Sequence, residues 1–305
     1  MLILIAGITG NIGQLAARYA LQLGHQVRGF SRSPDKLDPP VAQGLEGFIR
    51  SSSYYDVPAL DRACAGVDAV ICAYSGTPEL HLDGQLLLLR AAERAGIKRY
   101  LAASHNNDWR KIGMGDVPIY DPIKCFSIHA ALTSPIKPLF IISANFLDVF
   151  FGGEGQGDFT PAVGGPWDPK TREMHIWGTG DEKWYFTTEA DGAKWAVEVV
   201  TSANAERGGF VTICSMHVSL NEIRHIYEAT TGKHINVVRR GTVEDLEKTV
   251  LEKKSNATHW GDWLRYALVL HNTKNIWGLD VEEFHGFFPS SPSSLEEWLK
   301  AHPEA

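Results

Sequence analysis

The chain has 305 residues, a net charge of −7 and a pI near 5.9, with 44% apolar and 21% charged residues. This balance is ordinary for a globular protein of one large or two closely packed domains. An acidic chain without a Lys/Arg-rich block excludes the electrostatic footprint of nucleic-acid binding. No apolar run approaches the about 20 residues that span a bilayer, so no membrane association is expected.

Two further classes are excluded by local patterns. The four cysteines form neither a Cys-x-x-Cys pair nor a cluster with histidine, so we expect no metal site and no disulfide framework. The opening run MLILIA is too short for a secretory leader. We therefore expect a cytoplasmic protein. Its oligomeric state is left open by the sequence.

The first half of the chain alternates strand-like and helix-like stretches. A continuous apolar strand over 2–6 precedes a helix over 12–23, which Gly24 closes. Further strands are expected over 26–31, 47–49, 68–73, 99–104 and 139–143, and further helices over 58–65, 80–95 and 122–132. Such alternation with short links predicts an α/β fold with a doubly wound parallel sheet of the Rossmann type.

After about residue 150 the pattern changes. Residues 151–169 are rich in Gly and Pro and predict a loop. Strands are expected over 173–177 and 183–187, and helices over 190–200, 220–231, 243–253 and 293–299. We predict a Rossmann domain over 1–150 with 183–215 rejoining its sheet, and a smaller substrate-binding part made of 151–182 and 216–305.

The stretch GITGNIG, residues 7–13, lies between the first strand and the first helix. In a dinucleotide loop one glycine makes the turn, one lets the backbone approach the pyrophosphate, and one lets helix and strand pack closely. The helix N-terminus adds partial positive charge for phosphate. We therefore predict a dinucleotide-binding loop made of Gly7, Thr9, Gly10, Asn11, Ile12 and Gly13.

The end of the second strand selects the nucleotide. An NAD site places an acidic residue there to accept from the ribose 2′-hydroxyl. This chain has Ser31, Arg32 and Ser33, with Lys36 nearby and no acid until Asp35. A guanidinium with hydroxyl donors suits a 2′-phosphate, so we predict NADP(H). The alternative is that Arg32 is a solvated surface residue.

Polar and aromatic residues follow the later strands. Because ligands bind beyond the carboxyl ends of parallel strands, these residues are expected to line the same groove. We assign cofactor contacts to Tyr74, Ser75, Ser104 and Asn145.

With these residues in place, the chain resembles the atypical short-chain dehydrogenases of the NmrA-like and isoflavone-reductase-like type, especially fungal members. The resemblance is carried by GITGNIG and VRGFSR, and it extends to GTGDEKWYFTTEAD (178–191), VSLNEIRHIYEATTG (218–232) and the ending 288–299. It implies a Rossmann fold, NADPH and a small-molecule substrate held between the two parts. It does not fix an activity, because members reduce aromatic natural products, rearrange substrates or act as regulators.

Ser104, Tyr120 and Lys124 reproduce the Ser…Tyr-x-x-x-Lys spacing of a short-chain dehydrogenase. That chemistry needs a phenol to transfer a proton, an ammonium to lower the phenol's pKa, and a hydroxyl to orient the substrate. However, Asp121 precedes Pro122, which predicts an N-cap followed by the first helical position and leaves Tyr120 outside the helix. Tyr120 is therefore either the acid or a tyrosine of the pocket wall or of a loop.

Lys124 is expected in the first turn of that helix, and the resemblance implies a lysine in this region as a cofactor-binding or catalytic residue. The alternative is a solvated lysine. His105 and His129 are assigned to substrate binding, with hydrogen-bonded structural histidines as the alternative. Among many later aromatics, those that follow the sixth strand are predicted to contact substrate: Phe146, Phe151 and Trp167.

The leading hypothesis is an NADPH-dependent reductase of a small, aromatic or polycyclic secondary metabolite. The second is an enzyme on the same fold that rearranges or isomerises its substrate without net redox change. The third is an NADP-sensing regulator that binds a protein partner. Aromatic content and candidate proton-transfer groups favour an enzyme over a sensor, and they do not separate the first two hypotheses.

Overall fold

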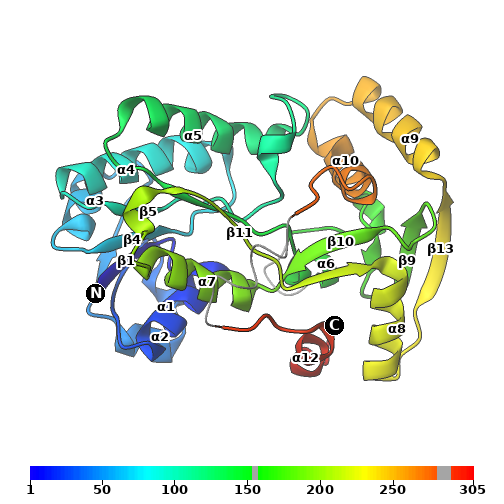
Figure 1. Ribbon diagram of the computed structural model, residues 1–305, viewed down its shortest axis with the longest axis horizontal. Coiled ribbons are helices and arrows are strands. Elements are labelled where there is room, and N and C mark those ends of the chain that lie inside the picture. The colour runs from blue at the N-terminus through cyan, green and yellow to red at the C-terminus, as the bar shows by residue number, and fades with distance from the viewer. Residues whose placement is uncertain (153–156, 280–289) are drawn as a thin grey trace. The chain divides into compact units, whose positions relative to one another are not determined.

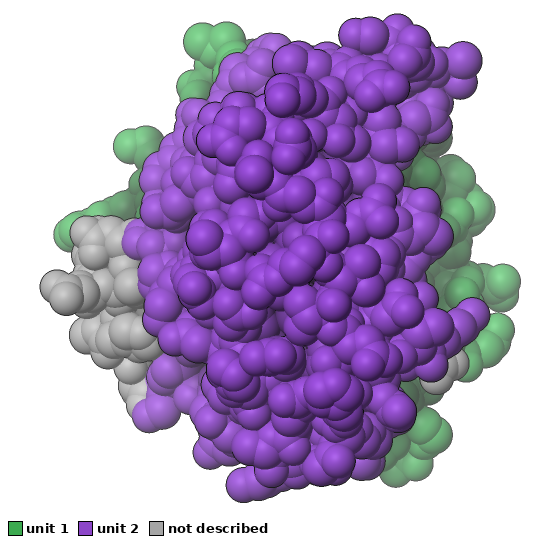
Figure 2. Space-filling model, turned by 90° about the vertical axis from the view of Figure 1, so that its right-hand side faces the viewer, with its two compact units in different colours: residues 1–106, 118–142, 189–213 green, residues 107–117, 143–188, 214–305 purple. Residues whose placement is uncertain are grey.

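The computed structural model describes residues 1–152, 157–279 and 290–305. The chain forms two compact units, each assembled from three separate segments. Unit 1 contains residues 1–106, 118–142 and 189–213, and unit 2 contains residues 107–117, 143–188 and 214–305 (Figure 2).

Unit 1 is built on a seven-stranded sheet in which every pair of neighbouring strands is parallel. The strand order is β11-β6-β5-β4-β1-β2-β3, so the chain reverses direction across the sheet between β1 and β4. This order confirms the predicted doubly wound Rossmann-type fold. The strands are β1 (Leu2–Ala6), β2 (Gln26–Ser31), β3 (Gly47–Arg50), β4 (Ala69–Cys72), β5 (Arg99–Leu101), β6 (Leu139–Ile142) and β11 (Gly209–Thr212).

Helices cover both faces of this sheet. α3, α4 and α5 lie on one face, and α1, α2 and α7 lie on the other, where α1 packs along α7 (Figure 1). Covering both faces buries the central strands, which explains their continuous apolar sequence. The helices are α1 (Asn11–Gln22), α2 (Pro39–Gly44), α3 (Val57–Cys64), α4 (Gln85–Arg94), α5 (Asp121–Thr133) and α7 (Glu189–Thr201).

The predicted helix over 80–95 has an irregular beginning. Residues Leu80–Gly84 form a π-helical turn, η2, before α4 begins at Gln85. The fully buried Gln85 side chain donates to the His81 carbonyl oxygen and accepts from the Ala103 amide. A buried amide with these partners holds the wide turn against the end of β5.

Unit 2 contains two three-stranded sheets and several helices. One sheet has the order β12-β10-β7, and the other has the order β13-β9-β8. The strands are β7 (Asn145–Phe146), β8 (Trp167–Asp168), β9 (Glu173–Trp177), β10 (Lys183–Thr187), β12 (Met216–Ser219) and β13 (Asn236–Gly241). The helices are α6 (Leu147–Phe151), α8 (Leu220–Thr231), α9 (Val243–Asn256), α10 (Gly261–Thr273) and α12 (Leu295–Ala301).

The division of the chain differs from the predicted domains at three segments. As expected, β11 joins the main sheet and α7 packs against its strands, but β10 pairs with β12 and β7 in unit 2. Residues 107–117 and 143–150 also belong to unit 2. Strand pairing is a long-range property, and an apolar run such as KWYFT fits either sheet equally well. Of the ending 288–299, which carries part of the resemblance, residues 288 and 289 lie outside the described residues.

Candidate functional site

The glycine loop makes a tight turn that only glycine fits. Gly7 has a φ of +84°, and a Cβ there would lie 2.6 Å from the Ala73 carbonyl oxygen. At Gly13 a Cβ would lie 2.4 Å from the Gly7 carbonyl oxygen and 2.7 Å from the Ile8 Cα. Gly7 therefore supplies the turn, and Gly13 allows α1 to pack against it, as predicted from their spacing.

The N-terminus of α1 is open to an anion. Gly10 caps the helix without a side-chain hydrogen bond, and the first turn carries no acidic residue. Asn11, Ile12 and Gly13 form that first turn. The amide groups and positive end of the helix dipole are therefore not neutralised by a local carboxylate, which is the arrangement that binds phosphate.

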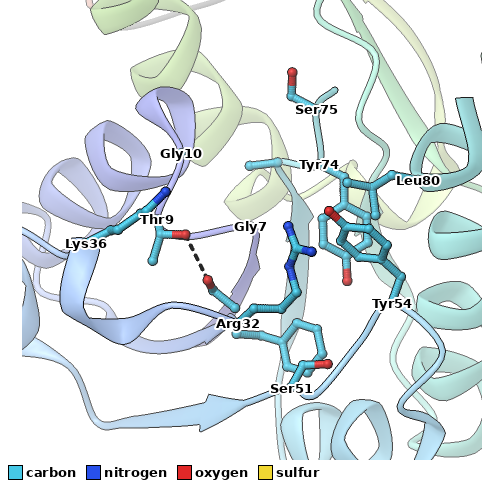
Figure 3. Close-up of a pocket in the computed structure, with 13 residues that line it drawn as sticks. Gly7, Thr9, Gly10, Arg32, Lys36, Ser51, Tyr54, Tyr74, Ser75 and Leu80 are labelled. Carbon is cyan, nitrogen blue, oxygen red and sulfur yellow. Dashed lines mark hydrogen bonds between the residues drawn. The ribbon is translucent and has the colours of Figure 1, made fainter. Parts of the chain in front are cut away.

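A pocket lies beside this loop, and eight predicted cofactor residues line it (Figure 3). They come from the glycine loop, the end of β2 with the turn that follows it, and the end of β4. They are Gly7, Thr9, Gly10, Ser31, Arg32, Lys36, Tyr74 and Ser75. Segments far apart in sequence thus converge at the carboxyl ends of β1, β2 and β4, next to the switch in strand order.

Hydroxyl and cationic groups gather at the end of β2. The Ser31 Oγ lies 2.8 Å from the Thr9 Oγ1 and accepts a hydrogen bond from the Ser33 amide at 3.2 Å. Arg32 and Lys36 are exposed, and within the described parts of the chain no carboxylate forms an ion pair with either. Their positive charge is therefore available to an anionic ligand.

Five residues of the pocket were not predicted from the sequence: Phe30, Ser51, Tyr54, Ala73 and Leu80. Phe30 and Ala73 directly adjoin predicted residues, so strand-end position was a sufficient signal for both. Ser51 and Tyr54 follow β3, and no residue beyond the carboxyl end of that strand was predicted to bind the cofactor. The Arg32 guanidinium carbon lies 4.3 Å from the centroid of the Tyr54 ring (Figure 3).

Tyr120 and Lys124 lie in one continuous helical stretch, which differs from the predicted break at Asp121-Pro122. A 3₁₀ turn, Pro118–Tyr120, leads directly into α5, and Asp121 is already its first helical residue. Tyr120 has helical angles of −92° and −12°. Pro122 is tolerated because its missing N–H falls in the first turn, where it would have no intrahelical acceptor. Residues four apart therefore share a face, and both are buried.

Ser104, His105 and His129 have different surroundings. The buried Ser104 hydroxyl donates to the Ala102 carbonyl and accepts from the Ile141 amide at 2.8 Å, so it links the segment after β5 to β6. Burial lowers the pKa of His105 to about 4, which keeps its imidazole neutral at pH 7. His129 is exposed on α5 and contacts Thr133 one turn later, so its position is that of a surface residue.

The remaining predicted residues belong to unit 2. The Asn145 amide bonds with Asn107, Asn272 and the Tyr185 carbonyl, and Phe146 is half-buried beside it. Phe151 and Trp167 are 2% and 1% exposed and meet edge-to-face at 5.7 Å in the unit's hydrophobic core. Their side chains are enclosed by core residues, so they stabilise the unit and offer no surface to a substrate, contrary to the prediction.

Within residues 1–152, 157–279 and 290–305, none of the helices combines the length and the apolar character that a membrane span requires.

The chain is similar to known proteins in its sequence and in its fold. A model of the NmrA-like family matches residues 1–299. A bifunctional pinoresinol-lariciresinol reductase from Linum usitatissimum is 28% identical over 206 residues, covering 65% of this chain and 64% of that protein. This match therefore spans less than two thirds of the relative's length. A phenylcoumaran benzylic ether reductase from Ginkgo biloba is 27% identical over 250 residues, covering 77% of each chain.

Among solved structures, the binary complex of leucoanthocyanidin reductase and NADPH from Vitis vinifera has a TM-score of 0.74 at 19% identity, covering 100% of both chains. At this identity the likeness shows the shared fold.

Proposed function

Because the chain belongs to the NmrA-like family, as its opening motif indicated, we propose that it is an NADPH-dependent reductase of a small aromatic metabolite. The observation that carries this proposal is the pocket at the carboxyl ends of β1, β2 and β4. There a glycine turn, an uncapped helix N-terminus and two cations without carboxylate partners in the described residues lie together.

The residues of the pocket fit NADP(H). Gly7 and Gly10 would bring the backbone and the first turn of α1 to the pyrophosphate. Arg32 and Lys36 would hold the 2′-phosphate together with the hydroxyls of Thr9 and Ser31. NADH lacks that phosphate and leaves both cations without an anionic partner. The pocket therefore favours NADPH.

When bound, NADPH supplies the hydride. The chain must then supply a proton to the substrate atom that receives negative charge, and Lys124 is the group we assign to it. Lys124 is a buried residue in the first turn of α5, on the continuous helical stretch that includes Tyr120. Tyr120 lies one turn before it and is the second candidate donor. Ser104 is left as a structural residue, because its hydroxyl already links the segment after β5 to β6.

The substrate class rests on the relatives. They are named as reductases of pinoresinol and lariciresinol, phenylcoumaran benzylic ethers and leucoanthocyanidin. One of these names specifies a benzylic ether as the group that is reduced. We assign this chain an aromatic substrate of comparable size, without naming the compound.

The test follows NADPH absorbance with a panel of benzylic ethers, aromatic ketones, enones and epoxides, with products identified by mass spectrometry. Oxidation of NADPH together with a reduced product is the expected result. Product without NADPH oxidation contradicts the reductase and selects a rearrangement. NADPH binding without product from any compound selects a sensor.

The residue assignment is tested in the same assay. Lys124→Met should abolish turnover while thermal unfolding and NADPH binding show a folded protein. Lys98→Met, which removes an exposed lysine elsewhere in unit 1, is the matched control and should turn over like the wild type. Equal activity of the two variants would remove Lys124 from the mechanism.

A further inference from the structure

Tyr54 lies where no sequence motif indicated a functional residue. It belongs to the loop between β3 and α3, and its half-buried ring lines the pocket beside Arg32. The Arg32 guanidinium carbon is 4.3 Å from the centre of the Tyr54 ring, which is within cation–π range. Resting on the NADP(H) site proposed above, we propose that Tyr54 is a positioning residue that holds Arg32 for the 2′-phosphate and so sets the preference for NADPH.

The loop that carries Tyr54 is held by local hydrogen bonds on both sides of it. The Asp56 carboxylate accepts from the Ser52 amide and hydroxyl and from the Ala59 amide, so it caps α3. The Ser51 hydroxyl donates to the Ser53 carbonyl. Because these bonds fix the backbone before and after Tyr54, the ring is presented from a defined position.

The Tyr54 ring also packs against a buried aromatic residue. Tyr54 meets Tyr74 in a tilted contact with centroids 6.5 Å apart, and Tyr74 is only 8% exposed at the end of β4. Arg32 by contrast is exposed at the end of β2 and has several rotatable bonds. Stacking against a fixed ring restricts that side chain before a ligand arrives, which lowers the entropy lost on binding.

The contact with the Tyr54 ring leaves the positive charge of the Arg32 guanidinium available to an anionic ligand. An aromatic face attracts the cation without neutralising it, unlike a carboxylate partner. The donors at the guanidinium edge stay available for a phosphate, as bidentate recognition requires. The interaction uses the ring and not the phenol hydroxyl, so phenylalanine should serve in place of tyrosine.

The test measures the dissociation constants of NADPH, NADH and the fragment 2′,5′-ADP by isothermal titration calorimetry. Tyr54→Leu should weaken NADPH and 2′,5′-ADP by about three- to fivefold, the size of an exposed cation–π contact, and leave NADH within about twofold. Tyr54→Phe should restore wild-type affinity. Tyr55→Leu makes the same change at the neighbouring, 57% exposed tyrosine and should change none of the three constants.

A double variant separates positioning from direct contact. If Tyr54 acts through Arg32, adding Tyr54→Leu to Arg32→Ala should weaken NADPH no further. Equal weakening of NADPH and NADH by Tyr54→Leu, additive losses in the double variant, or failure of phenylalanine to restore affinity would each overturn the proposal. A wild-type protein without a preference for NADPH over NADH would instead contradict the proposed NADP(H) site itself.

Discussion

Replacing Gly13 by alanine tests whether the turn and α1 approach each other as closely as the structure shows. A Cβ at this position would lie 2.4 Å and 2.7 Å from backbone atoms of Gly7 and Ile8. Backbone cannot rotate away as a side chain can, so the loop or the helix must shift. Overpacking of this kind costs about 1–3 kcal/mol, while the better helix propensity of alanine returns at most about 1 kcal/mol.

The expected net result for Gly13→Ala is a loss of about 1–2 kcal/mol in the free energy of unfolding, read from urea denaturation. NADPH affinity should fall by about tenfold or more, because Gly7 and Gly10 line the pocket and would move with the shifted loop. Gly47→Ala in β3 is the control, since no atom lies within 4 Å of its added Cβ. If Gly13→Ala is as stable and binds as well as Gly47→Ala, the close approach is refuted.

Three other substitutions have defined outcomes. Arg32→Ala should raise the dissociation constant of NADPH by about tenfold or more and spare NADH, because charged hydrogen bonds contribute about 1.5–3 kcal/mol; equal losses would show that Arg32 does not read the phosphate. Ser104→Ala should lower the free energy of unfolding by about 1–3 kcal/mol, because the buried Ile141 amide loses its acceptor; an unchanged urea midpoint would contradict this. Burial lowers the pKa of His105 from 6.5 in the unfolded chain to about 4 in the folded protein. Between these pH values the unfolded state binds more protons than the folded state. The free energy of unfolding should therefore fall, by up to about 3 kcal/mol, as the pH drops from 6.5 to 4. His105→Asn should remove that part of the pH dependence, and identical slopes for variant and wild type would exclude His105 as its source.

The Rossmann-type unit could be predicted from the sequence because its signals are local. A buried strand, a glycine turn and an amphipathic helix follow one another within residues 2–22, and each role of Gly7 and Gly13 follows from its place in that order. The position of Arg32 was equally local, since it directly follows the last residue of β2. These features do not depend on long-range pairing.

Features that depend on tertiary packing were harder to predict. Phe151 and Trp167 carry the residue types of both a ligand pocket and a core, and only burial distinguishes the two. Tyr54 lies in a Ser-rich loop without periodicity, and the role we propose for it depends on Arg32, which is distant in sequence but close in space. At Tyr120 the local preference of Asp-Pro for a helix boundary was correct within one residue, but the preceding 3₁₀ turn extends the helical path.

The most direct test of the central claim is whether hydride passes from NADPH to a substrate. The enzyme is incubated with NADPH carrying deuterium at the transferable C4 position, using the compound from the panel that yields product, and the product mass is measured. We predict one deuterium atom in each product molecule and an equimolar amount of NADP⁺. Product without deuterium, formed while NADPH stays intact, would contradict the assignment of this protein as a reductase.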